Sequence, residues 1–508
     1  MDIDDLPDLV LEIVFSYLNQ YGDLENVRLV SRRWHRVAST VISILKKSFL
    51  RCNQLIWELC AAKNEGDGAI AKRCSHSGCY HDGTKKVYIF GGCTDNYTAF
   101  NDLWSFDLKS HHWCREFIKC APFPRPKAMS IFVPYKEYLI LHGGFAKSSP
   151  NPIHQAANFF SEIHMYDTMT NEWIEVETEP PPPVIASHCA CVVGDSLIIF
   201  GGSQNSRATN TVYVLDITTK IWHIPSFENH KDESCGKSDA TSSERFLLKN
   251  PQPNPRYGSS CVVIDKSHLL VIGGCGGPNC IYNDAWLLTF DLTLQTAWEW
   301  KEINITNPKS GPSQLWCHPA CPIGRNLACI SYARRNDRYG TISLNSCPAP
   351  LQVTSRNRIQ LPPCSMNDVT LQPSNTGDNV DHTLNEKLNF SSCQQSFSSL
   401  HAKNNLKYIN GASGATLGKN WYHKRRQGNA CVYILDTARV LEDCTVTWRQ
   451  QEIDLKAPDD TMLYSLCAGR GELIMFGGMR SDVQGDNPHP FTHIINNDIY
   501  ILSPARLV

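Results

Sequence analysis

Five apolar runs along the chain end in a Gly-Gly pair, and each run is typical of a β-strand. The pairs are Gly91-Gly92, Gly143-Gly144, Gly201-Gly202, Gly273-Gly274 and Gly477-Gly478. After the first four pairs, a polar loop leads to a second apolar run that ends near an Asp, and a Trp follows at Trp113, Trp173, Trp222 and Trp298. No Gly-Lys-Ser/Thr follows the glycines, which argues against a phosphate-binding loop. A pattern that recurs with its aromatic partners predicts a repeat architecture.

The order of features in each repeat predicts four short antiparallel strands. The second strand ends in Gly-Gly, which suits a backbone that needs positive φ or passes too close to a neighbouring strand for a Cβ atom. The fourth strand contains the Trp, whose side chain is large enough to cover the face of the next sheet. Such sheets arranged radially form a propeller. The units resemble kelch repeats, and the resemblance implies a kelch β-propeller over most of residues 55–505.

The number of blades depends on two incomplete repeats. In the fifth, Ala430–Asp436 and Trp448 resemble the second half of a unit, and its first half is expected in residues 317–331. The intervening residues 334–429 are rich in Ser, Asn and Pro, which predicts a largely disordered insert within blade five. The sixth unit supplies three strands, so we expect the strand Leu55–Leu59 to close the ring and cover its edge. The sequence therefore predicts a mainly β chain with a six-bladed propeller.

Residues 1–46 have a different pattern, in which apolar residues recur at the spacing of three short helices. Three such helices bury little core by themselves, so this number of apolar residues predicts a docking surface. The segment resembles an F-box, whose order and spacing are matched by Leu6-Pro7, the run from Leu11 to Leu18, Asp23-Leu24 and the stretch from Val30 to Trp34. The alternative is a small helical cap packed on the propeller. Residues 47–54 are expected to form a short linker.

The F-box resemblance implies attachment to the adaptor Skp1, and through it to a cullin and a RING subunit. The residues that match the family's motif, and that would make or support this interface, are Leu6, Pro7, Ile13, Val14, Leu18, Leu24, Val30 and Trp34. Combined with the propeller, the resemblance implies a substrate-recognition subunit of a Skp1-cullin-F-box (SCF) ubiquitin ligase, which binds proteins for ubiquitination and proteasomal degradation. Such a subunit is not itself an enzyme: it raises the effective concentration of the target near the partner subunits.

The candidate substrate-binding residues lie in the loops that follow the Gly-Gly pairs. Loops between strands two and three lie at the same end of a propeller as the loops between blades, so both sets are expected to form one face. These loops contain aromatic and Arg side chains, which are over-represented at interface hot spots. The candidates are Asn96, Tyr97, Phe100, His154, Phe159, Arg207, Asn279, Tyr282, Arg480, His489 and Phe491. The insert begins in a loop of this set, so we expect it to emerge beside the same face.

Charge and cysteine usage exclude several classes of protein. The formal net charge is -2, which does not suit a basic nucleic-acid binder. The acidic start and the lack of a long apolar stretch argue against secretion and membrane insertion, so a cytoplasmic and/or nuclear location with reduced thiols is expected. The 22 cysteines are scattered, and only Cys317, His318 and Cys321 approach a metal-site pattern. Because further ligands at a matching spacing are missing, no metal or cofactor is expected.

Two other functions are consistent with a kelch propeller. The first is a protein-interaction scaffold that binds partners without a degradative role. The second is a radical copper oxidase, but such enzymes are secreted and need converging Tyr, His and Cys ligands, whereas the His and Cys residues here fall at unmatched positions of the repeat. Kelch adaptors of a different cullin begin with a longer BTB domain, for which about fifty residues leave no room.

Overall fold

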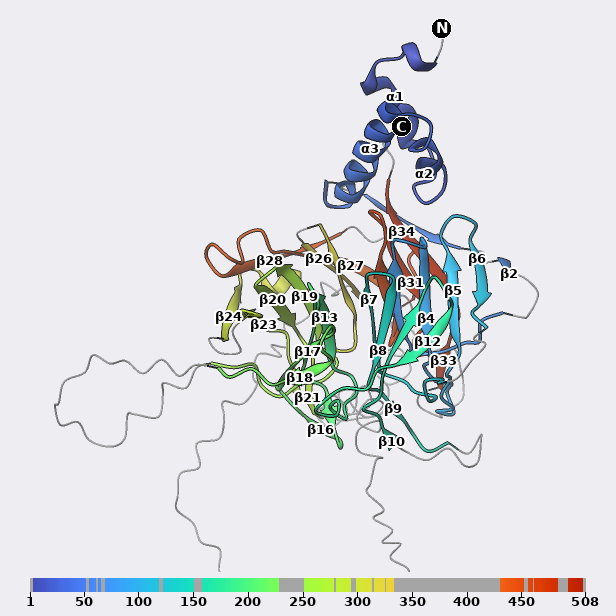
Figure 1. Cartoon of the computed structure of the whole chain (residues 1–508). Coiled ribbons are helices and arrows are strands. Elements are labelled where there is room, and N and C mark those ends of the chain that lie inside the picture. The colour runs from blue at the N-terminus through green and yellow to red at the C-terminus, as the bar shows by residue number, and fades with distance from the viewer. Residues whose placement is uncertain are drawn as a thin grey trace, which may run out of the picture.

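The computed structural model describes most of the 508-residue chain, namely residues 3–51, 54–60, 63–64, 69–117, 122–149, 158–227, 251–277, 280–293, 298–312, 315–324, 326–332, 430–451, 456–459, 461–482 and 492–505. A short 3-10 helix and three α-helices form a head at one end: η1 (Ile3–Asp5), α1 (Asp8–Ser16), α2 (Asp23–Val27) and α3 (Arg32–Arg51). The rest is mainly β-sheet (Figure 1). None of the helices in the described part is long and apolar enough to span a membrane.

Six four-stranded blades follow, counted within the described residues. In order from the inner to the outer strand, they are β3 (Ser77–His81), β4 (Lys86–Phe90), β5 (Leu103–Asp107) and β6 (His112–Arg115); β7 (Ile131–Tyr135), β8 (Tyr138–His142), β11 (Ile163–Asp167) and β12 (Glu172–Glu175); β13 (Cys189–Val193), β14 (Ser196–Phe200), β17 (Val212–Asp216) and β18 (Ile221–His223); β19 (Ser260–Asp265), β20 (His268–Ile272), β23 (Ala285–Thr289) and β24 (Glu299–Ile305); β25 (Ala320–Ile323), β26 (Asn326–Tyr332), β27 (Ala430–Asp436) and β28 (Thr445–Gln450); and β30 (Ser465–Ala468), β31 (Leu473–Phe476), β34 (Ile499–Pro504) and β1 (Leu55–Leu59).

The inner strands close a ring. Neighbouring contacts run from β3 to β7, β13, β19, β25 and β30, and β30 then contacts β3. The predicted fold class, a mainly β chain with a six-bladed propeller after a small helical head, is confirmed. Short pairs of strands extend the loops: β9 (Phe145–Ala146) with β10 (Asn158–Phe159), β15 (Ser203–Gln204) with β16 (Arg207–Ala208), β21 (Cys275–Gly277) with β22 (Cys280–Ile281), and β32 (Met479–Asp482) with both β29 (Thr461–Met462) and β33 (Thr492–Ile495).

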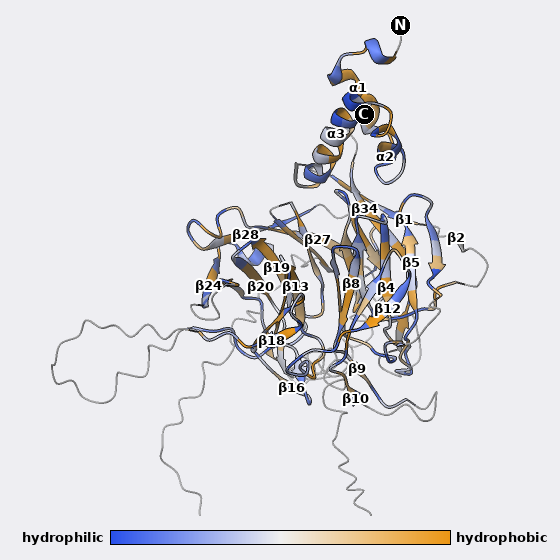
Figure 2. Ribbon diagram, in the orientation of Figure 1, coloured by the Kyte–Doolittle hydropathy of each residue, from blue (hydrophilic) through white to orange (hydrophobic). Residues whose placement is uncertain are grey.

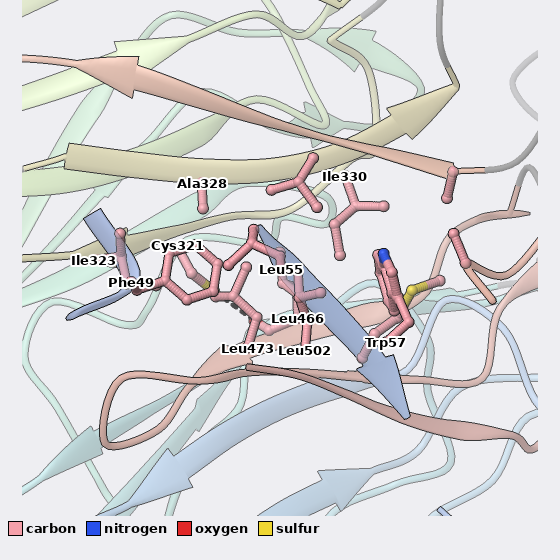
Figure 3. Packing of buried hydrophobic residues seen from close by; sticks show 14 of the residues in the cluster. Phe49, Leu55, Trp57, Cys321, Ile323, Ala328, Ile330, Leu466, Leu473 and Leu502 are labelled. Atoms are coloured by element: carbon pink, nitrogen blue, oxygen red, sulfur yellow. Dashed lines mark hydrogen bonds between the residues drawn. The ribbon is translucent and has the colours of Figure 1, made fainter. Parts of the chain in front are cut away.

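The sixth blade takes its outer strand from the beginning of the chain. Strand β1 pairs antiparallel with β34, with Leu55 opposite Pro504 and Leu59 opposite Tyr500. The side chain of Trp57 on this strand is buried, and it packs in the same core cluster as Phe49 (Figure 3). The two ends of the domain are thus held in one sheet. The predicted insert at residues 334–429 lies outside the described residues, which end at Tyr332 and resume at Ala430.

The expected end of the head at residue 46 and the linker at 47–54 need a correction. Helix α3 continues to Arg51, so the first part of the expected linker is helical. The continued helix brings Phe49, which is 0% exposed, into contact with the core of blades five and six. Burial of this ring accounts for the longer helix, because a buried Phe side chain contributes about 1.5–3 kcal/mol.

The Gly-Gly pairs join each blade to the next one. The second glycine donates its N–H across the blade boundary, as in Gly144 to Ile185 O at 2.8 Å, Gly274 to Leu315 O at 2.7 Å and, where the ring closes, Gly478 to Arg73 O at 3.0 Å. The first glycine has no room for a side chain: Gly273 has a φ of +65°, and a Cβ atom there would lie 2.2 Å from Leu315 O. The repeat is therefore explained by close backbone contact between blades.

Parallel pairing also protects the outer edges of the blades. The end of β24 pairs with β28 of the next blade, with Asn304 opposite Thr445, which joins blades four and five into one eight-stranded sheet. Strand β2 (Lys63–Asn64) pairs with the outer strand β6 of blade one in the same way. These pairings cover strand edges that could otherwise pair with another chain.

Buried histidines make the stability of the propeller depend on pH. Burial lowers the pKa of His76 and of His188 to about 3 each, and it lowers the pKa of His142 well below its ordinary 6.5. The rings of His142 and His188 touch, with Nδ1 and Nε2 3.2 Å apart. The folded state keeps these rings neutral, whereas the unfolded chain binds protons below its ordinary pKa. The unfolded state therefore gains protons that the folded state does not bind as the pH falls below 6.5. The free energy of unfolding is highest above pH 6.5 and decreases as the pH falls.

We expect the free energy of unfolding to decrease steadily from pH 6.5 to pH 5, by up to about 1.4 kcal/mol per pH unit for each buried histidine, and the unfolding temperature to fall with it. His188→Gln should make this dependence shallower, as measured by thermal unfolding at a series of pH values. His268→Gln is the control, because His268 is only half-buried and pairs with Asp265 in a turn. A slope in His188→Gln equal to that of the unmodified protein would contradict the assignment.

Candidate functional site

The head has a small core and a separate exposed apolar face. Its core contains Leu11, Phe15, Leu24, Val37, Ala38, Val41 and Ile42. Of the eight predicted adaptor-binding residues, Leu24 is fully buried in this core, and Leu6, Leu18 and Trp34 pack against it. These four side chains hold the head together. The other four are exposed, namely Pro7, Ile13, Val14 and Val30.

Four further apolar side chains extend the exposed face, and the sequence reasoning did not single them out. They are Leu9, which is 68% exposed, Val10, Tyr17, which is 58% exposed, and Leu29, which is 85% exposed. The sequence does contain a sign of this face, because α1 has apolar residues on more than one side of the helix. Leu11 and Phe15 are buried in the core of the head, whereas Ile13 is exposed. Helices that pack only on their own domain have one apolar face, so the second face indicates a partner. Hydrophobic colour is visible on the head helices as well as on the blades (Figure 2).

An ionic contact centred on the buried guanidinium of Arg470 attaches the head to the propeller. Arg470 lies in the turn between β30 and β31, and only 4% of its side chain is exposed. Its guanidinium donates to Asp82 in the β3–β4 turn, at 2.8 and 3.1 Å, and to Glu25 in α2, at 2.5 Å. It also donates to the carbonyl of Gln20 at 3.0 Å. Blades six and one are therefore tied to α2 through one cation, and this cation holds the pKa of the Asp82 carboxyl well below its usual range.

Close packing surrounds this ionic contact. The Tyr21 hydroxyl donates to Glu472 at 3.0 Å and accepts the backbone N–H of Arg470 at 3.2 Å. Gly471 has a φ of +84°, and a Cβ atom there would lie 2.2 Å from the carbonyl of Leu45 in α3. Together with Phe49, these contacts hold the head in one orientation on the propeller.

We expect Arg470→Ala to loosen the head without unfolding the propeller. Asp82 and Glu25, whose side chains are 53% and 30% exposed, would lose their shared cation, and the carbonyl of Gln20 would lose its donor, so the hydrogen bonds that link α2 to blade six would be gone. Amide hydrogen exchange in residues 20–27 should become at least about tenfold faster, which corresponds to about 1.4 kcal/mol. Arg449→Ala in blade five is the control, since Arg449 forms a half-exposed pair with Asp436. Unchanged exchange in residues 20–27 would mean that Arg470 does not hold the head.

The head and the candidate substrate face lie at opposite ends of the propeller. Asp82 and Arg470 lie in turns between strands one and two, whereas the Gly-Gly pairs lie at the other end of strand two. In Figure 1, the head is at the top and the short strands β9, β10, β16 and β21, which follow the Gly-Gly pairs, are at the bottom. The head and these loops therefore lie on separate faces of the molecule.

Seven of the eleven predicted face residues fall in the described part of the chain. Asn96 and Arg207 are exposed there. The other five are partly buried, namely Tyr97, Phe100, Phe159, Tyr282 and Arg480. His154, Asn279, His489 and Phe491 lie outside the described residues.

Two of the predicted face residues cover buried arginines. The guanidinium of Arg73 lies 4.4 Å from the ring centre of Phe100, and that of Arg256 lies 4.4 Å from the ring centre of Tyr282. Both arginines are 0% exposed. At least one ring face of Phe100 and of Tyr282 is therefore used inside the protein, so these residues have a structural role in addition to any role in recognition.

The loops of blades one and two meet on this face. The Lys147 ammonium lies 3.7 Å from the ring centre of Tyr97, and the hydroxyls of Thr98 and Ser149 are 3.0 Å apart. Ser149 also donates to the carbonyl of Asn96 at 3.1 Å. In blade six, Arg480 pairs with Asp459 at 2.6 Å. The structure thus joins Asn96 and Tyr97 to the neighbouring loop, while Arg207 stands on the separate β15–β16 hairpin.

One of the residues closest to a metal-site pattern, Cys321, is engaged in the packing of the inner strands. Cys321 lies on the inner strand β25, and its thiol donates to the carbonyl of Leu466 at 2.8 Å. Within the described ranges, no three His, Cys, Asp or Glu side chains are placed so that they could hold a metal ion. Burial raises the pKa of the Cys321 thiol well above its ordinary value, which keeps it protonated.

Comparison with known proteins gives two family matches. The family described as F-box-like matches residues 3–51, and the family described as "FBX42, beta-propeller domain" matches residues 73–298. Kelch domain-containing protein 1 of Mus musculus is 24% identical over 314 residues, which cover 58% of this chain and 68% of the relative. Its Homo sapiens counterpart is 26% identical over 283 residues, which cover 52% and 62%. Leucine-zipper-like transcriptional regulator 1 of Pongo abelii is 28% identical over 254 residues, which cover 42% and 29%.

The fold and these matches support a protein of the F-box/kelch type. An F-box head followed by a kelch propeller supports a substrate-adaptor role, and this architecture is typical of non-catalytic adaptor proteins. The F-box-like segment supports interaction with Skp1-type components of SCF ligases.

Proposed function

We propose that the chain is a substrate-recognition subunit of an SCF ubiquitin ligase and that it is most like F-box only protein 42. The observation that carries the proposal is the exposed apolar face of a head that has its own complete core. Ile13, Val30 and Leu29 are 54%, 61% and 85% exposed, although each could have been buried in a head that only capped the propeller. Exposed apolar patches of this kind mark interaction sites.

In this proposal, Skp1 covers the exposed face and connects the chain to a cullin and a RING subunit. The target protein binds the opposite end of the propeller, around Asn96, Tyr97 and Arg207. The chain performs no bond-making step itself. It accelerates ubiquitin transfer by raising the effective concentration of the target at the partner subunits.

The fixed attachment of the head supports separate roles for the two ends of the molecule, adaptor binding at the head and target binding at the opposite face. Because Arg470, Tyr21 and Phe49 fix the orientation of the head, a bound target is held at a defined position relative to the ligase. A loose tether would spread the target over many positions and would lower its effective concentration. A fixed head favours modification of lysines in a limited zone of the target.

The test is a comparison of the intact protein with the double variant Ile13→Glu, Val30→Glu in cells, using proximity labelling and protein half-lives. The intact protein should label Skp1 and a cullin. The variant should lose both and should accumulate target proteins, whose half-lives lengthen. If targets are captured equally by both proteins and their half-lives do not change, the chain is a kelch scaffold without a degradative role.

A further inference from the structure

A backbone bridge recurs at the same place in four blades, directly after the Gly-Gly pair. In each case, the residue after the pair forms an isolated antiparallel bridge with the segment that leads into the inner strand. The bridged pairs are Cys74 with Cys93, Ala128 with Phe145, Ala186 with Ser203 and Tyr257 with Cys275. Blade one therefore has two cysteines at a position where other blades have packing residues of varied size.

The two cysteines have backbone geometry that a disulfide can span. Cys74 N donates to Cys93 O at 3.1 Å, and Cys93 N donates to Cys74 O at 2.9 Å. Residues that exchange both hydrogen bonds in an antiparallel pair have Cα atoms about 5.5 Å apart, which lies in the middle of the range for disulfides. The two Sγ atoms are 4.0 Å apart. Bond formation therefore requires the two Sγ atoms to approach by about 2 Å, through side-chain rotation and a small closure of the backbone bridge.

The surroundings exclude a large oxidant. Both side chains are 5% exposed, and they pack with Ala128 and Ile495. A protein thiol or glutathione disulfide needs in-line access to a sulfur atom, which this packing blocks. Contact with the Cys93 thiol lowers the pKa of Cys74, although burial opposes this effect, whereas the Cys74 contact and burial raise the pKa of Cys93. The Cys74 thiol therefore ionises more readily than the Cys93 thiol, and the Cys93 thiol lies beside it.

We propose that Cys74 and Cys93 form an intramolecular disulfide when the protein meets hydrogen peroxide. The Cys74 thiolate attacks one peroxide oxygen, the S–O bond forms, the O–O bond breaks, and the leaving hydroxide takes up a proton to become water. The Cys93 sulfur then attacks the Cys74 sulfenic acid, the S–S bond forms, the S–O bond breaks, and the leaving hydroxide takes the Cys93 proton. Two thiols lose two electrons in total, and one peroxide is reduced to two waters.

The disulfide would act on the candidate substrate face. Cys93 begins the loop that contains Asn96 and Tyr97, and Cys74 lies between Arg73 and Ser75. Those two neighbours close the ring, because Arg73 O accepts from Gly478 and Ser75 N donates to Leu463 O. The bond would fasten a recognition loop to the closure between blades six and one. This inference is independent of the proposed ligase role, since it concerns the chemistry of the propeller alone.

The experiment is a peroxide titration of the full-length reduced protein, followed by alkylation of free thiols, trypsin digestion and mass spectrometry. Cleavage at Lys85 and Lys86 separates the two cysteines, so the disulfide appears as a linked pair of peptides that is two hydrogens lighter than the sum of its parts. Fragmentation distinguishes Cys74 from Cys79 in the same peptide. We expect the link at Cys74 and Cys93 to form at least about tenfold faster than oxidation of Cys275.

Cys275 is a matched internal control. It stands at the same bridge position in blade four and is buried, but it faces the hydroxyl of Tyr257 at 3.6 Å, which cannot form a disulfide. In Cys93→Ser, the linked peptides should disappear, and dimedone added together with urea should trap a sulfenic acid at Cys74. In Cys275→Ser, the link should form as in the unmodified protein. Oxidation should also slow amide exchange in residues 93–100.

The proposal is overturned if Cys74 and Cys93 stay alkylatable at a peroxide concentration that oxidises the exposed Cys114. It is also overturned if either residue links to another cysteine instead. Mapping of the unmodified protein decides the question even if a Ser variant fails to fold.

Discussion

Asp284→Ala is expected to lower the free energy of unfolding by about 3–5 kcal/mol, the usual cost of removing one partner from a buried ion pair. Arg256 is 0% exposed and donates to both carboxylate oxygens of Asp284, at 2.6 and 2.9 Å. It also donates to Gly273 O at 2.9 Å. Without the carboxylate, the buried guanidinium keeps only carbonyl oxygens and the ring of Tyr282 as partners, and no counter-charge, at a contact between blades. Urea unfolding followed by Trp fluorescence measures the change.

Asp459→Ala is the matched control, because Asp459 and Arg480 form an ion pair that is 63% and 39% exposed. Its loss should cost at most about 1 kcal/mol. The double variant Arg256→Met, Asp284→Leu should regain much of the stability lost in Asp284→Ala. The carbonyl of Arg256 accepts the N–H of the preceding Gly-Gly pair, and the residues that do so before blades three and five are Ile185 and Leu315. Because both are apolar, this position accepts an apolar side chain. A change in Asp284→Ala no larger than in Asp459→Ala would show that the pair is not needed.

The double variant Ile13→Glu, Val30→Glu is expected to abolish capture of Skp1 while the head stays folded. Both side chains are more than half exposed, so the substitutions bury no charge within the chain itself. In a complex, each carboxylate would be placed in an apolar interface, and interface anchors typically cost about 2 kcal/mol or more each. The expected loss of affinity is at least about 100-fold, measured by titration of purified Skp1.

Thr40→Glu on α3 is the control, because Thr40 is exposed on the head but lies outside the apolar face. Circular dichroism should show the same helix content in all three proteins. Leu6→Ala is a weaker test, since Leu6 packs on the core of the head and its removal would also loosen the fold. Full affinity of the Glu variant for Skp1 would rule out this face as the adaptor site.

Local sequence patterns predicted the repeat and the head because the physics behind them acts over short distances. Gly273 must be glycine because of its own φ and the neighbouring carbonyl, and strand alternation and helical spacing show within ten residues. The same patterns could not distinguish core residues of the head from residues of its exposed apolar face. Ile13 and Leu24 are both apolar residues at helical spacing, but only the packing of three helices decides that Leu24 is core and Ile13 is surface.

The sequence by itself determined the class of fold, the six-fold repeat and the likeness to an F-box, because each rests on residues close together in the chain. Only the tertiary structure decided where the head sits, that Arg73 and Arg256 need the rings of Phe100 and Tyr282, and that Cys74 meets Cys93. Arg470 and Glu25 are 445 residues apart, yet their side chains form one ion pair. The physical reason is that a closed ring brings together turns from distant repeats, and no periodicity in the chain records which of those turns will touch.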